Sequence, residues 1–271
     1  MTAGPDTAAA PAMSRRDRLA ALASLVGLAA LAWTYLWWDA ASMAGMAMPG
    51  EGMATAGAMA MSAVSAWHIE PLLLTFLMWS VMMVGMMLPS AAPAILLYGS
   101  MVGKNRERRS ALPAIWAFTA GYLAVWTGFS AAAAGLQALL EANALLTPMM
   151  VSASHWLTGG LLVAAGIYQW LPVKQACLEK CRAPLQFFMF HWRPGLTGAF
   201  RMGAGHSAFC LGCCWVLMLL LFTAGVMNLL WVALIAGFVI AEKLLPAGAF
   251  TGRLAGIGLA IAGVATILAN G

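Results

Sequence analysis

Long apolar stretches separated by short polar segments constrain this chain more than any other feature of its sequence. They lie at about residues 19–38, 72–98, 112–137, 153–172, 207–226, 229–247 and 252–269. A membrane-spanning helix needs about 20 mainly apolar residues, which is close to the length of each stretch. Only 8% of the residues are charged, against about 25% in a typical soluble domain. The sequence therefore predicts an all-α fold, a polytopic helical membrane bundle with about seven transmembrane helices.

The Lys and Arg residues indicate how this bundle is oriented. With the amino terminus in the cytoplasm, all 14 of them fall on the cytoplasmic side of the predicted spans. Cytoplasmic loops of membrane proteins carry an excess of Lys and Arg. We therefore expect a multi-pass protein of a bacterial inner membrane, with its amino terminus in the cytoplasm and its carboxyl terminus outside.

Four segments follow from these spans. Residues 1–18 are expected to form a disordered cytoplasmic tail, and residues 19–38 the first transmembrane helix. That helix is longer than the apolar core of a cleavable signal, and an Ala-rich site after Trp38 leaves cleavage as the alternative. Residues 39–71 form a Met-rich outside loop, and residues 72–271 a six-helix membrane domain with a cytoplasmic, Cys-containing loop at 173–206. The lipid bilayer is the expected partner, and the short basic clusters exclude nucleic acid.

Methionines in the second apolar stretch are the first group of candidate metal ligands. They are Met78, Met82, Met83, Met86 and Met87. At about 100° per residue, three of them share one helical face and the other two form a neighbouring ridge. Thioether sulfur prefers Cu(I) to harder ions, although methionine also packs well against other helices or lipid.

The fifth apolar stretch carries a second group of candidate ligands. They are His206, Cys210, Cys213, Cys214 and Met218. Residues four apart share a helical face, and Cys213 lies one turn from Cys210. Thiolates beside an imidazole predict a Cu(I) site, with Zn(II) as the alternative metal. Small buried residues that fill a tight helix interface are the other interpretation.

Three further sets carry alternatives of their own. Cys177 and Cys181 are spaced to lie on one side of a short helix, which fits metal binding, redox exchange or two ordinary thiols. Charges inside a membrane, such as Glu242 and Lys243, usually pair or serve a pathway, unless they snorkel to the surface. The outside loop either supplies further Cu(I) ligands or is a plain linker. Its candidate ligands are Met43, Met46, Met48, Met53, Met59, Met61 and His68.

Several of these segments together resemble a known family. They are residues 78–90 (MWSVMMVGMMLPS), 168–174, 177–182, 210–215 and 225–228, and the pair Glu242 and Lys243. The family is one of predicted metal-binding integral membrane proteins, and some of its members are described as copper chaperones. The similar segments cover about residues 70–245, and the resemblance implies a membrane location and the handling of a soft metal.

These observations favour a Cu(I)-binding membrane protein that acts as a copper chaperone or facilitator, exchanging metal with a donor or acceptor protein. The sequence has no phosphate-binding GxxxxGK[ST] motif, no nucleophile elbow and no HExxH, so we expect no enzyme activity. A thiol–disulfide membrane protein and a structural assembly subunit of a membrane complex remain the alternatives. A homo-oligomer or membership of a larger complex fits each of them.

Overall fold

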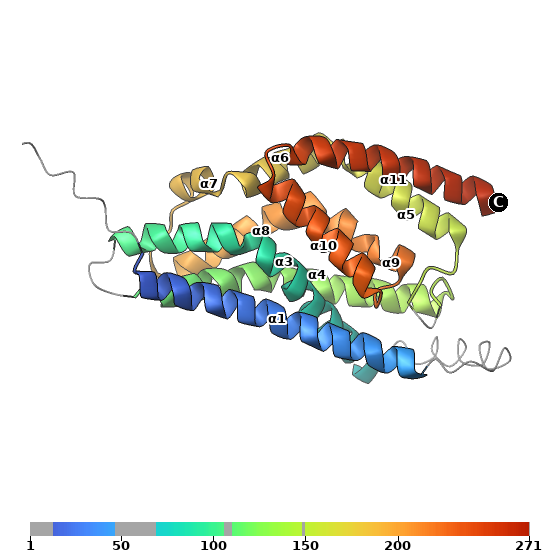
Figure 1. Cartoon of the computed structure of the whole chain (residues 1–271), viewed down its shortest axis with the longest axis horizontal. Coiled ribbons are helices and arrows are strands. Elements are labelled where there is room, and N and C mark those ends of the chain that lie inside the picture. The colour runs from blue at the N-terminus through green and yellow to red at the C-terminus, as the bar shows by residue number, and fades with distance from the viewer. Residues whose placement is uncertain (1–12, 47–68, 106–109, 148–149, 271) are drawn as a thin grey trace, which may run out of the picture.

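The structure, a computed structural model, describes residues 13–46, 69–105, 110–147 and 150–270 (Figure 1). Within these ranges the regular elements are helices, which confirms the predicted all-α class. They are α1 (Arg15–Met46), α3 (Ile69–Asn105), α4 (Leu112–Ala142), α5 (His155–Tyr168), α6 (Pro172–Arg182), α7 (Pro184–Phe190), α8 (Gly195–Leu219), α9 (Leu221–Ala224), α10 (Leu229–Leu244) and α11 (Gly248–Asn270).

The predicted count of seven spans is wrong. Five of the described helices, α1, α3, α4, α8 with α9, and α11, are long and apolar enough to cross a membrane. A sixth crossing is obtained only if α5 and α6 form one span, across a bend of 64°. Helix α10 has 16 residues, about 24 Å at 1.5 Å per residue, which falls short of a hydrocarbon core of about 30 Å. Figure 1 shows α10 running back from α9 only as far as α6.

Several predicted boundaries also differ from the observed ones. Helix α1 begins at Arg15 and ends at Met46, so it takes in the end of the expected tail and the start of the expected outside loop. The expected loop at 173–206 consists mostly of α6, α7 and the first turns of α8. Pro172 and Pro184 each stand in the first turn of a helix, where a missing amide donor costs nothing. Residues 1–12 and 47–68 lie outside the described residues.

Close contact between α4 and α8 sets the position of the cysteine-bearing helix. A Cβ atom added to Gly121 would overlap the carbonyl of Phe200, and one added to Gly203 would overlap that of Phe118. Small residues let two helix backbones approach closely. Because both glycines lie on the same contact, α8 is held against α4 at a distance that larger residues would not permit.

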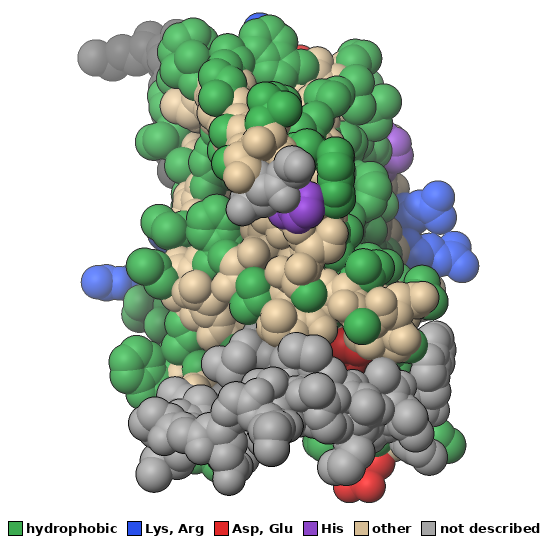
Figure 2. All heavy atoms as spheres, turned by 90° about the vertical axis from the view of Figure 1, so that its right-hand side faces the viewer, with side chains coloured by type: hydrophobic (Ala, Val, Ile, Leu, Met, Phe, Trp, Pro, Cys, Tyr) green, Lys and Arg blue, Asp and Glu red, His purple; other side chains and the backbone are tan. Residues whose placement is uncertain are grey.

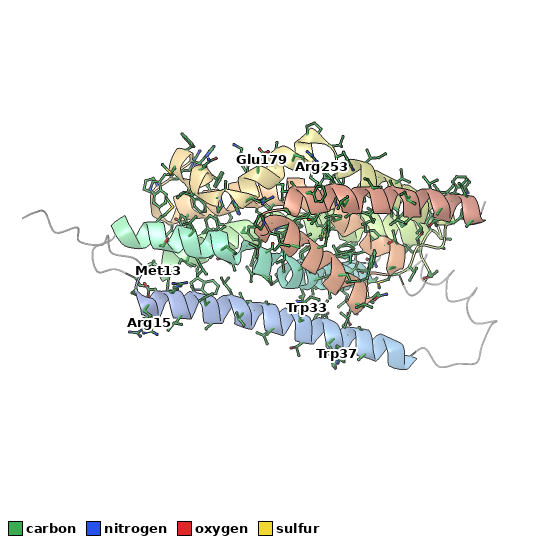
Figure 3. The ribbon with its side chains drawn as sticks, turned by 45° about the horizontal axis from the view of Figure 1, so that its top comes forward. Met13, Arg15, Trp33, Trp37, Glu179 and Arg253 are labelled. Carbon is green, nitrogen blue, oxygen red and sulfur yellow. The ribbon has the colours of Figure 1, made fainter. Side chains whose placement is uncertain are left out.

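Helix α1 covers α3 at its proline-rich stretch. Pro89 has no amide hydrogen, so the carbonyl of Gly85 loses its ordinary helical partner. The indole Nε1 of Trp33 donates to that carbonyl oxygen at 3.3 Å, and Trp33 lies on the side of α1 that faces the bundle (Figure 3). The helix therefore passes through Pro89 with its freed carbonyl satisfied by a neighbouring helix.

The outer surface of the described bundle is largely apolar. Large hydrophobic side chains on α1 and α11 point outward, including Val26, Leu31, Ile261 and Leu268. Figure 2 looks onto the right-hand end of Figure 1 and shows Lys and Arg side chains only at the margins of the view. An apolar exterior of this extent is typical of helices that face lipid.

Candidate metal centre

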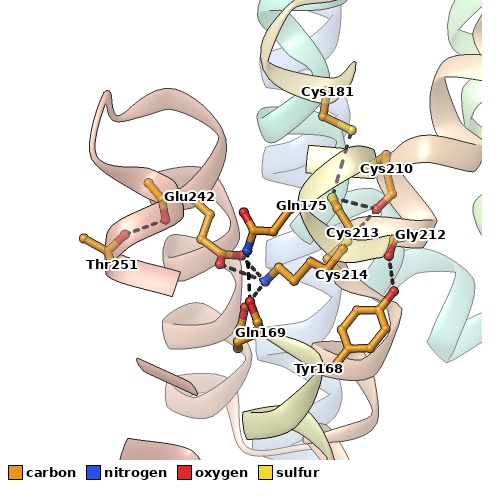
Figure 4. A network of polar contacts seen from close by, with 12 residues as sticks. Tyr168, Gln169, Gln175, Cys181, Cys210, Gly212, Cys213, Cys214, Glu242 and Thr251 are labelled. Atoms are coloured by element: carbon orange, nitrogen blue, oxygen red, sulfur yellow. Dashed lines mark hydrogen bonds and ion pairs between the residues drawn. The ribbon is translucent and has the colours of Figure 1, made fainter. Parts of the chain in front are cut away.

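Three thiols lie together on one turn of α8, inside the bundle. Cys210, Cys213 and Cys214 are each 1% exposed or less. The thiols of Cys213 and Cys214 both donate to the carbonyl oxygen of Cys210, at 3.1 and 3.0 Å. This arrangement folds both sulfurs back along the helix, where they face other helices and not lipid (Figure 4).

Helix α6 brings a fourth sulfur to this turn. The Sγ atoms of Cys181 and Cys213 lie 4.0 Å apart. With metal–sulfur bonds of about 2.3 Å, that separation corresponds to a sulfur–metal–sulfur angle of about 120°. One metal ion therefore fits between these two sulfurs without movement of either helix. Cys177 lies against α8 as well, because a Cβ atom on Gly212 would stand 2.7 Å from its Sγ.

Helix α3 supplies thioether sulfur to the same turn of α8. The Sγ of Cys214 lies 4.0 Å from the Sδ of Met87. All the candidate methionines are buried in the described structure, with at most 4% exposure: Met78, Met82, Met83, Met86, Met87 and Met218. Met87 thus faces Cys214 inside the bundle, and the other methionines in this list are buried with it.

Polar groups surround the thiol of Cys210. The Nζ of Lys243 donates to its Sγ at 2.9 Å and also to the Oγ of Ser90 at 2.9 Å. The hydroxyl of Tyr122 lies 3.0 Å from the same sulfur. Lys243 does not snorkel to the surface: its side chain is buried, and its ammonium contacts Ser90 of α3 and Cys210 of α8.

His206 stands one turn before Cys210 and is buried among aromatic rings. Phe118, Tyr122 and Phe188 lie around its imidazole, with ring centroids 6.2–6.4 Å away. Its Nδ1 atom has no hydrogen-bond partner in the described structure. A cavity of about 90 Å³ beside it is lined by His206, Cys210, Cys181, Tyr122, Ser90 and Lys243 among others. An unpartnered imidazole nitrogen beside such a cavity is free to act as a ligand.

Glu242 belongs to a second buried network next to this site. Both of its carboxylate oxygens accept from the Nζ of Lys174 at 2.8 Å. Lys174 also donates to the side-chain oxygen of Gln169, and Gln175 donates to the backbone of Gln169 at 2.9 Å. The network joins the break between α5 and α6 to the end of α10 (Figure 4).

Sequence reasoning missed Lys174, Tyr122 and Ser90 as parts of this region. A signal for Lys174 was available, because a carboxylate within an apolar stretch needs a cation. Tyr122 and Ser90 gave no signal, since their role depends on how α3, α4 and α8 pack. The methionines of the outside loop lie in residues whose positions or side chains are outside the described part.

The described residues form sulfur pairs and no closed cage. They contain no group of three or more His, Cys, Asp or Glu side chains placed to surround one metal ion. Structural Zn(II) sites are almost always four-coordinate, whereas thiolate and thioether sulfur selects Cu(I). The donor set fits a soft cation of low coordination number better than it fits zinc.

Comparison with known proteins agrees with this chemistry. No curated protein and no solved structure matches the chain. The family PpoB2, described as copper chaperone, matches residues 76–266, which include the sulfur residues of α3, α6 and α8. That match covers well over half of the sequence. The chain therefore belongs to the PpoB2 copper chaperone family.

Proposed function

We propose that this chain is an integral membrane protein that binds Cu(I) through its buried sulfur residues and passes it to or from a partner protein. The observation that carries the proposal is the meeting of sulfur from α3, α6 and α8 on a single turn. Met87 faces Cys214 and Cys181 faces Cys213, each at 4.0 Å. A soft cation bound at one pair needs only a short movement to reach the other.

The sulfur types favour a direction of transfer. Thioethers dominate on α3 and thiols on α6 and α8, and thiolate binds Cu(I) more strongly than thioether does. Copper therefore moves from the methionines towards Cys213 and Cys181. With no ATP-binding motif in the sequence, the chain acts as a chaperone or facilitator and not as an enzyme or a pump.

We place the protein in a bacterial inner membrane with the amino terminus in the cytoplasm. The outward-facing apolar side chains of α1 and α11 support insertion into lipid. Helix α1 begins at one end of the bundle and α11 ends at the other (Figure 1), which suits termini on opposite sides. On this orientation a cytoplasmic metal donor or acceptor meets the end that carries α6 and α7.

Anaerobic titration with Cu(I) tests the metal function. The purified full-length chain is compared with a variant in which Cys210, Cys213 and Cys214 are changed to Ser, and with Met202→Leu. Met202 is a buried methionine of the same helix that lies outside the sulfur pairs. We expect the wild type and Met202→Leu to bind Cu(I) equally and the triple variant to lose it. Equal binding by all three proteins would contradict the proposal.

The approach of Cys181 to Cys213 also favours a second candidate, a thiol–disulfide membrane protein. All five cysteines are free, so the pair has two thiols available for oxidation. Trapping of thiols in cells separates the two functions. A copper chaperone keeps Cys181 and Cys213 reduced, whereas a redox protein accumulates a Cys181–Cys213 disulfide.

A further inference from the structure

The buried ammonium of Lys243 is a fixed positive charge inside the proposed metal site. Its Nζ contacts a sulfur, that of Cys210, and a neutral hydroxyl, that of Ser90. The nearest carboxylate in sequence, Glu242, is occupied by Lys174. Within the described ranges, the sole Lys or Arg ion pair with an Asp or Glu is that of Lys174 and Glu242. The group in contact with Lys243 that can carry a balancing negative charge is therefore the sulfur of Cys210.

We propose that Lys243 determines the charge of the metal that this site accepts, and that it selects a monovalent soft cation over a divalent one. This inference rests on the proposed function and assigns a specificity residue to the same site. It follows from the net charge that the buried cluster carries with each type of ion.

Two thiolates, one Cu(I) and one ammonium sum to zero charge. In the proposed site Cys210 and Cys181 supply the two thiolates, because both line the same cavity as Lys243. His206 and the methionines are neutral donors and do not alter the sum. Two thiolates and one divalent ion are neutral by themselves, so Lys243 then leaves one uncompensated positive charge. Uncompensated charge is strongly disfavoured in a buried site.

Removal of the ammonium reverses this preference. Without Lys243, a Cu(I) bis-thiolate carries one negative charge and a Zn(II) bis-thiolate carries none. At an effective dielectric constant of about 20, a unit charge about 4 Å away changes a binding constant by about 100-fold or more. The ratio of Cu(I) to Zn(II) affinity should therefore fall by at least that factor in a neutral variant.

The cavity beside Cys210 provides room for an ion next to the charged group. It is lined by Cys181, His206, Cys210 and Lys243, and its volume of about 90 Å³ exceeds that of one metal ion. Lys243 donates to Ser90 from one side of this cavity, so its charge is held beside the sulfurs and not directed to solvent. The geometry thus keeps the ammonium within reach of a bound cation.

The test measures the ratio of Cu(I) to Zn(II) affinity in the purified full-length chain, by anaerobic competition against a chromophoric chelator of each ion. Lys243→Met and Lys243→Gln remove the charge, and the second keeps a hydrogen-bond donor for Ser90. Lys243→Arg keeps the charge. Lys180→Met is the matched control, since Lys180 lies on α6 next to Cys181 but is exposed, where its charge is screened by solvent.

We expect the affinity ratio to fall by about 100-fold or more in the two neutral variants, and to stay near the wild-type value in Lys243→Arg and Lys180→Met. An unchanged ratio in a folded neutral variant overturns the inference and leaves the copper function intact. A wild type that binds Zn(II) as tightly as Cu(I) overturns it without any variant. A wild type that binds no Cu(I) refutes the proposed function itself.

Discussion

The ion pair between Lys174 and Glu242 should be the most sensitive polar contact in the bundle. Lys174 is 0% exposed and Glu242 is 2% exposed. The ammonium donates to both carboxylate oxygens at 2.8 Å and has a third acceptor in Gln169. Lys174→Met leaves the carboxylate of Glu242 buried with no cation, a change that typically costs about 3–5 kcal/mol of unfolding free energy.

A double-mutant cycle separates the pair from the packing around it. Glu242→Met should cost a similar amount to Lys174→Met, because it leaves the ammonium unpaired. Replacing both residues by Met removes both charges, and such replacements are often neutral. We therefore expect the double variant to lie within about 1 kcal/mol of the wild type. The predicted coupling energy is several kcal/mol and favours the pair.

Unfolding in mixed micelles with increasing denaturing detergent provides the measurement. Burial of the cysteines makes the rate of thiol labelling a second readout, since Cys210, Cys213 and Cys214 react only when the bundle opens. A double variant as unstable as either single variant would refute this reasoning. Single variants with wild-type stability would refute it as well.

Three further outcomes are expected. Cys181→Ser should weaken Cu(I) binding by about 10-fold or more, and Cys177→Ser should weaken it much less. The reason is that the Cys181 sulfur lies 4.0 Å from that of Cys213, whereas Cys177 faces the backbone at Gly212. Equal losses of Cu(I) affinity in a chelator competition would contradict this prediction. Met87→Leu preserves side-chain volume, so it should cost less than about 1.5 kcal/mol of unfolding free energy. It should nevertheless weaken Cu(I) binding, because the thioether sulfur is lost. Unaltered Cu(I) binding would show that Met87 is not part of the site. Gly203→Val should lower the unfolding free energy by about 1–3 kcal/mol or more, because its Cβ would meet the carbonyl of Phe118. Gly128→Ala on α4 should leave the unfolding free energy unchanged, because Gly128 has open space around it. Similar stability of the two variants would contradict the close contact of α4 and α8.

The sequence predicted the elements of the bundle better than their lengths. Apolar stretches locate α1, α3, α4, α8 and α11, because hydropathy reports which residues avoid water. Hydropathy does not report where a chain turns inside the protein. The break before Pro172 and the end of α10 at Leu244 therefore escape prediction, because the apolar stretches run through both positions.

The sulfur residues show the same limit at the level of the site. Helical spacing predicts that His206, Cys210 and Cys214 share a face, and the structure places all three in the interior. Spacing along one helix says nothing about what that face meets. The approach of Cys181 and Met87 to α8, and the contact of Lys243 with Cys210, depend on how separate helices pack.

X-ray absorption spectroscopy of the Cu(I)-loaded chain tests the sulfur site most directly. It reports the element bound to copper and its distance. We predict two or three sulfur neighbours at about 2.3 Å, and their loss when Cys210, Cys213 and Cys214 are changed to Ser. Copper coordinated only by nitrogen or oxygen, or a spectrum unchanged in the triple variant, would show that the metal binds elsewhere.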